Sequence, residues 1–448
     1  MPIPLAVDQL LSDKRFRKAS RRRWREMKGR ARLAEQRRVN KLRFGDYSRI
    51  VRMLADCCTA DVKLPRAGAK VVVPPTFSII DDPVTALQVI LSFAKLAREN
   101  RLRTVEIDHS RMQVCDLAAN AVLDLVASEL STEARQRHSK IRFFGRYPIP
   151  THLKRFVQCI GIVKQLSIAH EVPSPEEKNG VRVFDKRKRH YHDPVDPTQA
   201  DFKSRVAVDF VDHINDCLND HGRALTPAAV HKLCVYIGEI LGNAEDHAGF
   251  EDWTIQGYLD NAVNTPMCEI AIFNFGASIA ETLTGLPADS YTWRQISSYV
   301  LMHRGARLFR AGWRERDLLT LIALQGNVSS KNRSEKDTRG QGTVDLIEFF
   351  QKVYEECATG SGEAAKMAIL SGSTHILFDG KYRLSGLPGR GKVIAFNAEN
   401  TLYKQPDSSY VKSLGTLKFP GTIISIRFPL STTSTVALGV NRNEPNRD

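Results

Sequence analysis

The sequence predicts an α/β protein, and three observations lead to that class. Between residues 46 and 170, short apolar runs of strand length alternate with helical patterns. Between residues 201 and 430, a long amphipathic helix precedes two strand-like runs, and a further helix and strand follow. Apolar residues form 42% of the 448 residues, which is enough for the cores of about two or three domains.

Residues 1–45 are predicted to form a basic helical arm. They hold 15 Lys and Arg against four Asp and Glu, so +11 of the +15 formal net charge lies here. Arginine clusters beside an aromatic side chain suit nucleic-acid phosphates, an acidic protein partner or an anionic membrane surface. A solvated segment without a partner is the remaining interpretation. The cluster consists of Arg21, Arg22, Arg23 and Arg25 around Trp24, with Arg37 and Arg38 further along.

Residues 46–170 are predicted to form a compact α/β unit with a partly parallel sheet. Three apolar runs have the length of short strands, and a helical pattern follows each of them. The expected strands are 71–73, 104–108 and 140–144, and the expected helices are 83–98, 116–130 and 152–166.

The centre of this unit reads VEIDHSRMQVCDLAANAVLDLV, from Val105 to Val126. With the order of elements around it, this is similar to STAS domains, the anti-sigma-antagonist fold; another small α/β fold is the alternative. In that family a phosphorylated serine follows an aspartate at the start of the central helix. The corresponding pair here is Asp116 and Leu117. The resemblance therefore implies the fold without the phosphorylation switch.

Two segments are predicted to lack regular structure. Four prolines punctuate residues 171–200, which also carry the basic run from Lys186 to Arg189, and we expect a solvated linker there. The basic run could also extend the basic surface of the arm. Residues 431–448 are rich in Ser, Thr and Asn and are expected to form a disordered tail.

The helix predicted from Leu233 to His247 is the most informative segment. Its apolar residues follow the i, i+4, i+7, i+8 rhythm of one buried stripe. Glu239, Asn243 and Asp246 share one flank of that stripe at about 100° per residue. An amide oxygen can ligate a hard cation and a carboxylate can polarise a water, so the pattern suits a magnesium–phosphate site. The same spacing is common on solvated helix faces, so the later segments decide between the two.

Three later segments follow in a fixed order. Strands at 253–259 and 268–273, joined by a turn, lead into the sequence from Asn274 to Ile279, which contains Gly276. A basic polar stretch at 326–339, with Lys331 inside it, ends at the sequence Gly340-Gln-Gly342-Thr343 before a new helical pattern. Backbone N–H groups at such a glycine turn and helix start favour phosphate. The last segment is a strand that opens with Gly421 and Thr422 and closes at Pro429.

This order resembles the GHKL, or Bergerat-fold, ATPases, which include gyrase, the heat-shock chaperones, histidine kinases and anti-sigma kinases. The resemblance implies an α/β sandwich with a mixed sheet backed by helices, an ATP lid at 326–342, and ATP and Mg²⁺ as ligands. It implies that Asn243 ligates Mg²⁺ and that Glu239 is catalytic, acting on a water or an acceptor hydroxyl. The implied nucleotide contacts are Asn243, Asp246, Asn274, Gly276, Ile279, Lys331, Gly340, Gly342, Thr343 and Thr422.

Two positions depart from the family pattern. The residue expected to meet the adenine amino group is Asn274, whose amide oxygen still accepts a hydrogen bond but carries no charge. The second glycine of the same box is Ser278. Three functions therefore stay open: an ATP-driven regulatory switch coupled to a protein or nucleic-acid partner, an anti-sigma-type protein kinase, and a non-catalytic scaffold with a degenerate pocket.

Composition excludes several other classes. The eight cysteines form no C-x-x-C pair, so we expect reduced thiols and no zinc site. No apolar run has the length of a membrane span, and no signal peptide is recognisable. We therefore expect a cytoplasmic protein. In the GHKL family lid closure commonly couples to dimerisation or partner capture, so the resemblance also implies a possible homodimer.

Overall fold

The computed structural model describes most of the chain from Arg49 onward, and the residues from Ile50 to Asp448 belong to one compact unit. The predicted arm lies outside the described residues, and with it the six arginines named for its cluster: Arg21, Arg22, Arg23, Arg25, Arg37 and Arg38. The described ranges are 49–62, 68–98, 102–136, 141–161, 180–188, 202–220, 222–247, 249–250, 252–261, 263, 266–310, 312–326, 328–329, 331–332, 334, 341–357, 364–386, 392–430 and 440–442.

The first part of the chain forms an α/β layer, here called the N-terminal layer. Its sheet consists of three parallel strands in the order β1-β3-β5, which confirms the predicted parallel pairing. A separate parallel pair joins β2 and β4. The elements are α2 (Arg49–Asp56), β1 (Gly68–Val72), β2 (Thr76–Phe77), α3 (Pro83–Arg98), β3 (Thr104–Asp108), β4 (Val114–Cys115), α4 (Leu117–Gln136), β5 (Arg142–Arg146) and α5 (Thr151–Cys159).

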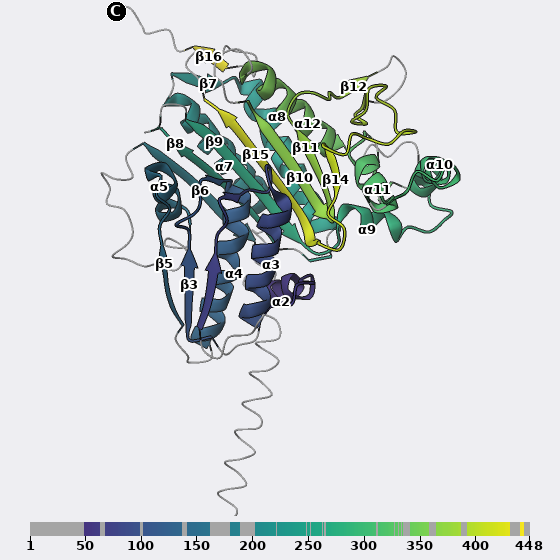
Figure 1. The fold of residues 1–448 in the computed structure, drawn as a ribbon. Coiled ribbons are helices and arrows are strands. Elements are labelled where there is room, and N and C mark those ends of the chain that lie inside the picture. Colours follow the sequence, from purple (N-terminus) through teal and green to yellow (C-terminus); the bar gives the residue numbers. More distant parts are fainter. Residues whose placement is uncertain are drawn as a thin grey trace, which may run out of the picture. The chain divides into compact units, whose positions relative to one another are not determined.

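A seven-stranded sheet forms the centre of the unit (Figure 1). Every neighbouring pair in it is antiparallel, so the mixed sheet that the resemblance implied is wrong here. In spatial order its strands are β14 (Val411–Ser413), β11 (Thr374–Phe378), β10 (Lys366–Gly372), β15 (Phe419–Pro429), β9 (Met267–Phe275), β8 (Trp253–Asp260) and β6 (Val181–Lys188).

The predicted linker at 171–200 is wrong in its middle part. Residues Val181–Lys188 form the edge strand β6, which pairs with β8 along its whole length. The basic run that we expected to be solvated contributes Arg187 to a buried ion-pair cluster with Glu129 and Asp252. Side chains of this strand alternate between the two faces of the sheet, with Phe184 on one face and Arg187 on the other. Charged residues occur on both faces, so the sequence does not show the alternation of apolar and polar residues that predicts a strand.

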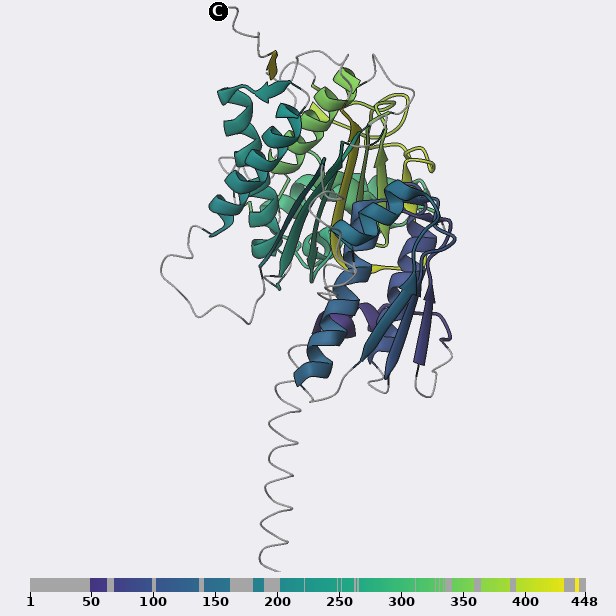
Figure 2. The ribbon, with the colours of Figure 1, turned by 90° about the vertical axis from the view of Figure 1, so that its left-hand side faces the viewer.

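Helices cover one face of the seven-stranded sheet, here called the helix face (Figure 2). Apolar residues of β8 and β9, such as Ile255, Ile270 and Ile272, pack against these helices in one core. The helices of the second half of the chain are α7 (Phe202–Asn219), α8 (Pro227–His247), α9 (Ile279–Thr284), α10 (Tyr291–Gly305), α11 (Glu315–Ala323) and α12 (Gln341–Cys357).

The opposite face of the same sheet, here called the α4 face, packs on the N-terminal layer. The intervening residues of β9, Ala271, Phe273 and Phe275, share a second core with apolar residues of α3 and α4. The alternation of a β-strand therefore sends one set of β9 side chains to each core. The two predicted domains at 46–170 and 201–430 thus do not have separate cores, because the first covers a face of the sheet of the second.

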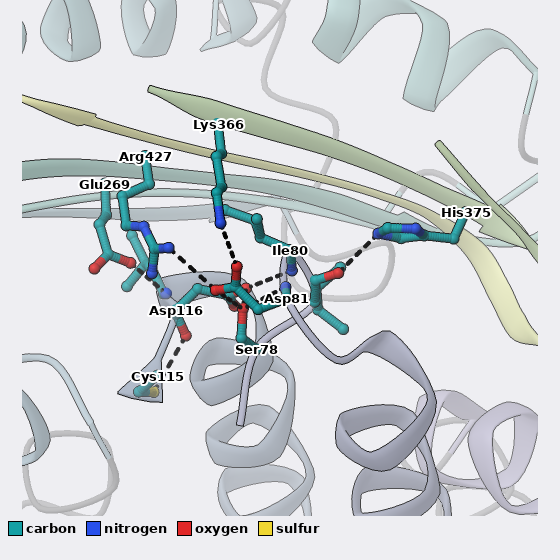
Figure 3. Close-up of polar contacts among 11 residues, drawn as sticks. Ser78, Ile80, Asp81, Cys115, Asp116, Glu269, Lys366, His375 and Arg427 are labelled. Atoms are coloured by element: carbon teal, nitrogen blue, oxygen red, sulfur yellow. Dashed lines mark hydrogen bonds and ion pairs between the residues drawn. The ribbon is translucent and has the colours of Figure 1, made fainter. Parts of the chain in front are cut away.

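Polar contacts join the N-terminal layer to the sheet at the start of α4 (Figure 3). Asp81 pairs with Lys366 Nζ at 2.8 Å and with Arg427 Nη2 at 3.1 Å. The backbone N–H of Leu117 donates to Glu269 Oε2 at 2.6 Å. Each of these bonds connects residues that are more than a hundred positions apart in the sequence, so they form only when the layer docks.

The predicted disordered tail also contains a strand. Residues Val440–Arg442 form β16, which pairs antiparallel with β7 (Arg223–Leu225), while the rest of 431–448 lies outside the described residues. A two-stranded sheet, β12 (Ser385–Gly386) with β13 (Lys392–Val393), completes the described strands. Among the described helices, none is long and apolar enough to cross a membrane.

Candidate functional site

A cavity of about 140 Å³ opens between the seven-stranded sheet and its helices, and we call it the helix-face cavity. Its volume is roughly ten times the space that one water needs. Five of the predicted nucleotide contacts line it, from five different segments of the chain: Asn243, Asn274, Ile279, Thr343 and Thr422. The other described lining residues are Ile240, Ala244, Ile272, Ala277, Thr282, Leu283, Ala323, Leu324, Val328, Ser329, Leu346, Ile369 and Ile424.

Helix α8 supplies one wall, as its amphipathic pattern predicts. Ile240 and Ala244 are buried on the apolar stripe, and Asn243 lies on the flank beside them and lines the cavity. Glu239 is exposed and is not among the described lining residues. Asp246 belongs to α8, but its side chain lies outside the description.

Strands β9 and β15 place two polar side chains on the cavity floor. Asn274 and Thr422 are direct cross-strand partners, so both side chains point to the helix face of the sheet. The strands approach closely here. A Cβ atom on Gly421 would lie 2.0 Å from the backbone oxygen of Asn274, and the φ of Gly421 is 141°. Gly276 also has a positive φ, 124°, and donates its N–H to the Pro420 carbonyl. Both glycines therefore serve the backbone, and neither is among the described lining residues.

Ser278, the second departure from the family pattern, has a structural function. Its side chain caps α9 by accepting from the Glu281 N–H, and the Glu281 carboxylate accepts from the Ser278 N–H in return. This capping box fixes the start of α9 and with it Ile279, which lines the cavity. A glycine at 278 would lose this cap.

One contributor was not predicted. Ser371 at the end of β10 accepts the Ile279 N–H at 2.9 Å, and its hydroxyl lies 2.8 Å from Thr422 Oγ1. It thereby ties the start of α9 to the cavity floor. The run MAILS before Gly372, read as an apolar strand with a polar last residue, was the available signal.

The predicted hinge of the lid lies at the start of α12. Thr343 lines the cavity, and a Cβ atom on Gly342 would lie 2.4 Å from Glu239 Oε2. Glu239 therefore contacts the backbone one residue before the cavity wall. Although the residue as a whole is exposed, partial desolvation of its carboxyl group, with a smaller contribution from the charge of Asp345, raises the pKa of Glu239. Gly340 lies outside the described residues.

Part of the predicted lid forms the remaining wall. Val328 and Ser329, which follow α11, line the cavity. Lys331 comes two residues later, and its N–H donates to Ser329 Oγ, but it is not among the described lining residues. Of the stretch from 326 to 339, six residues are described, all of them before 335, and the remainder lies outside the description.

The chemistry of the lining is apolar and uncharged. None of the described lining residues is acidic or basic, and aliphatic side chains dominate it. The amide of Asn274 has no hydrogen-bond partner among the described residues, although Asn274 is only 9% exposed. A buried amide of this kind needs a partner, because desolvation without a hydrogen bond is costly. Such a lining fits a flat, neutral heterocycle with polar edges better than it fits phosphate groups.

No group of three or more His, Cys, Asp and Glu side chains among the described residues has the arrangement of a metal centre. The described cysteines are all free thiols, as expected. Comparisons of the chain with family models, with curated proteins and with solved structures returned no match.

Proposed function

We propose that the chain binds Mg-ATP in the helix-face cavity and acts as a GHKL-type regulatory ATPase, a nucleotide-driven conformational switch. One observation carries this proposal: residues chosen from the sequence for nucleotide binding, between Asn243 and Thr422, line the same cavity. A chance resemblance in widely separated segments gives no reason for their side chains to converge.

The described residues suit the purine base of the nucleotide in one place, the cavity, and its phosphates in another, the start of α12. The uncharged cavity suits the purine ring, and the Asn274 amide oxygen, free of other partners among the described residues, can accept from the adenine amino group. The phosphates belong at the start of α12, where backbone N–H groups near Gly342 and Thr343 lack helical partners. Asn243 would hold Mg²⁺, which supplies charge neutralisation for the phosphates when bound.

Glu239 has the position of a residue that acts on a water or an acceptor hydroxyl at the outer end of the phosphates. Its carboxylate lies against Gly342, at the start of the helix to which we assign the phosphates. The raised pKa makes it a better proton acceptor than an ordinary surface carboxylate. Because the lid contributes Val328 and Ser329 to the cavity wall, nucleotide binding would couple to the position of the lid.

The alternative of a kinase that phosphorylates its own STAS-like layer is disfavoured by the docking of α4. Leu117, at the position of the family's phosphorylated serine, is 1% exposed, and its N–H is bound by Glu269. A phosphate donor could therefore not reach a side chain at position 117 in this arrangement. A partner protein or nucleic acid, recruited by the basic arm, remains our proposal for what the switch controls.

Isothermal titration calorimetry with Mg-ATP tests the proposal on the full chain. We expect binding by the wild type and by Thr254→Val, a matched control on the other face of the sheet, and its loss in Asn243→Ala. Hydrolysis assays and transfer of labelled phosphate then separate the functions. Hydrolysis without protein labelling supports the switch, and labelling of an added protein supports the kinase. Absence of binding by the wild type at millimolar Mg-ATP would reject both and leave the scaffold.

A further inference from the structure

The three-stranded sheet of the N-terminal layer has one covered face and one open face. Val71, Val105 and Ile107 point to the covered face, because they belong to the core that this sheet shares with α3 and α4 (Figure 1). The residues that alternate with them, and the register partners of those residues on β5, point the other way. We call the surface that they form the outer face; it comprises Gly68, Lys70, Val72, Thr104, Glu106, Asp108, Arg142, Phe144 and Arg146.

An aromatic ring lies in the middle of the outer face. Phe144 is 54% exposed at the centre of β5, whereas its neighbour Phe143 packs against the core. In the sheet, Phe144 is the register partner of Glu106, so its side chain projects from the face of the sheet. A ring that a strand holds in this way, half in solvent, offers a flat apolar surface to another flat group.

Two arginines flank the ring along the same strand. Arg142 and Arg146 lie two residues before and two residues after Phe144, on the same face and about 13 Å apart between their Cα atoms. The side chain of Arg142 is exposed and has no polar partner among the described residues. The side chain of Arg146 is 67% exposed and has one long contact among those described, 3.8 Å to Glu106. Both guanidinium groups are therefore available to an anion.

The carboxylates of the outer face do not cancel this charge. Glu106 and Asp108 both pair with Lys70, at 2.9 and 2.8 Å. Arg103, just before β3, is exposed, and its carbonyl accepts the Arg142 N–H, which places it at the same end of the sheet. With the two arginines of β5, four described basic residues at this face therefore meet two acidic ones, and the excess charge is positive.

We propose that the outer face binds single-stranded nucleic acid, with a base stacked on Phe144 and phosphates held by Arg142 and Arg146. A single strand presents flat bases and anionic phosphates in alternation, and β5 presents a guanidinium, a ring and a guanidinium in the same order. A duplex keeps its bases inside the stack and cannot offer one to the ring. This surface is separate from the helix-face cavity, and the proposal does not depend on nucleotide binding there.

Two other occupants fit the outer face less well. A second copy of the chain, paired antiparallel along β5 about Phe144, would set Arg142 opposite the partner's Arg146, and like charges in that position are unfavourable. An acidic peptide would satisfy the arginines. Peptides that add to a sheet, however, bind the backbone groups of its edge strand, and Phe144 projects from the face instead.

Fluorescence anisotropy with the full chain tests the proposal, using a labelled single strand of about twelve uridines in the absence of ATP. We expect the wild type to bind, Phe144→Ala to bind about tenfold more weakly, and Phe144→Tyr, which keeps the ring, to bind like the wild type. Arg142→Gln should weaken binding and reduce its salt dependence by about one phosphate contact. Leu301→Ala, which removes another exposed apolar side chain, on α10, is the matched control and should change nothing.

Cross-linking locates the bound strand, because residues 1–45 also carry an excess of +11 and could hold the same probe. After irradiation of the wild type with a 5-bromouridine strand, we expect an adduct in the peptide that contains Phe144, found by mass spectrometry. Adducts confined to other peptides would overturn the proposal, as would equal affinities of Phe144→Ala and the wild type.

Two further measurements test the other occupants. Polyglutamate that competes better than unlabelled oligonucleotide would indicate an acidic peptide and overturn the proposal. A dimer in sedimentation velocity that Phe144→Ala dissociates would assign the face to a second copy and overturn it as well. Asn243→Ala, in the helix-face cavity, should bind the single strand like the wild type, so failure of the proposed nucleotide function would leave this result unaffected.

Discussion

The two faces of the seven-stranded sheet differ in the kind of side chain that they bury. On the helix face, aliphatic side chains from β8, β9 and α8 form a core, and the cavity within it carries no charged residue among those described. On the α4 face, carboxylates and guanidinium groups are buried beside the apolar core, and burial raises the pKa of Asp116 and of Glu269. The first face contains an uncharged cavity, and the second holds two layers together through buried charged groups.

This difference teaches which features of a site a sequence can reveal. The polar residues of the helix-face cavity lie at the ends of apolar segments, where the apolar periodicity of the sequence stops and makes them noticeable. A cavity between α4 and strands β6 and β8 takes its polar lining from the middle of elements that the pattern does not mark, such as Asp185 in a basic run and Gln256 in a strand. Buried charges are costly unless paired, so their function depends on partners that are distant in sequence.

The largest loss of stability is expected when Arg187, the buried basic residue on the α4 face, is replaced. Arg187→Leu would remove the guanidinium that pairs with the buried carboxylates of Glu129 and Asp252, which are at 7% and 5% side-chain exposure. We expect a loss of about 4 kcal/mol in the free energy of unfolding, measured by urea denaturation. Arg304→Leu, which removes an exposed pair with Glu315, should cost less than about 1 kcal/mol. Equal losses in the two variants would contradict the contrast between the buried and the exposed pair.

The second prediction concerns pH. Burial raises the pKa of Glu269 from 4.5 to about 7, against the opposing effects of Arg427 and the Leu117 N–H. Between these values the folded chain retains a proton that the unfolded chain has released, so stability from this group falls as the pH rises through the window. The loss amounts to roughly 3 kcal/mol. Glu269→Gln, which resembles the protonated acid, should flatten this part of the pH profile in urea denaturation, and an unchanged profile would refute the assignment.

The third prediction concerns the helix face, where β9 and β15 approach each other closely at Gly421. Gly421→Ala would place a Cβ atom 2.0 Å from the Asn274 carbonyl oxygen and force an unfavourable φ of 141°. We expect a loss of about 2 kcal/mol and, because the floor of the cavity moves, weaker nucleotide binding. In Gly238→Ala the added Cβ meets nothing within 4 Å, and the helix should gain up to about 1 kcal/mol. Calorimetry and denaturation of both variants compare the two outcomes.

The smallest effect belongs to the cap of α9. Ser278→Ala removes the side-chain half of the capping box with Glu281, which should cost about 1 kcal/mol, seen as a lower melting temperature. Nucleotide affinity should fall little, because Ser278 is not among the described lining residues. If Ser278 instead contacts the ligand, the affinity would fall more than the stability.

Much of the secondary structure was predictable from the sequence. The helix at 83–98 and the strand at 104–108 have the predicted boundaries, and α8, β8, β9, α12 and β15 are where apolar periodicity places them. The helix predicted over 152–166 is described only to Cys159, and residues 162–170 lie outside the description. The strand at 181–188 was missed because charged side chains on a half-buried edge strand imitate a linker.

The candidate nucleotide site was predictable in its composition but not in its shape. Asn243, Asn274, Thr343 and Thr422 were chosen because polar residues at segment ends match a known order of boxes, and they line one cavity. Ser329 and Thr282 have no local signal that separates them from ordinary loop and helix residues, and the only signal for Ser371 is its place as the polar residue after an apolar run. Their contribution follows from the pairing of β10 with β15 and from the path of the chain after α9 and α11.

By itself, the sequence determined the α/β class, the order of helices and strands, and the residue types available for a nucleotide, because these depend on local periodicity and spacing. Only the tertiary structure decided that the two predicted domains share a core and that Arg187, Glu129 and Asp252 meet. The physical reason is that burial and charge pairing are properties of three-dimensional neighbours. A carboxylate in a solvated helix and one sealed beneath α4 have the same letter in the sequence, and only the surroundings separate their energies.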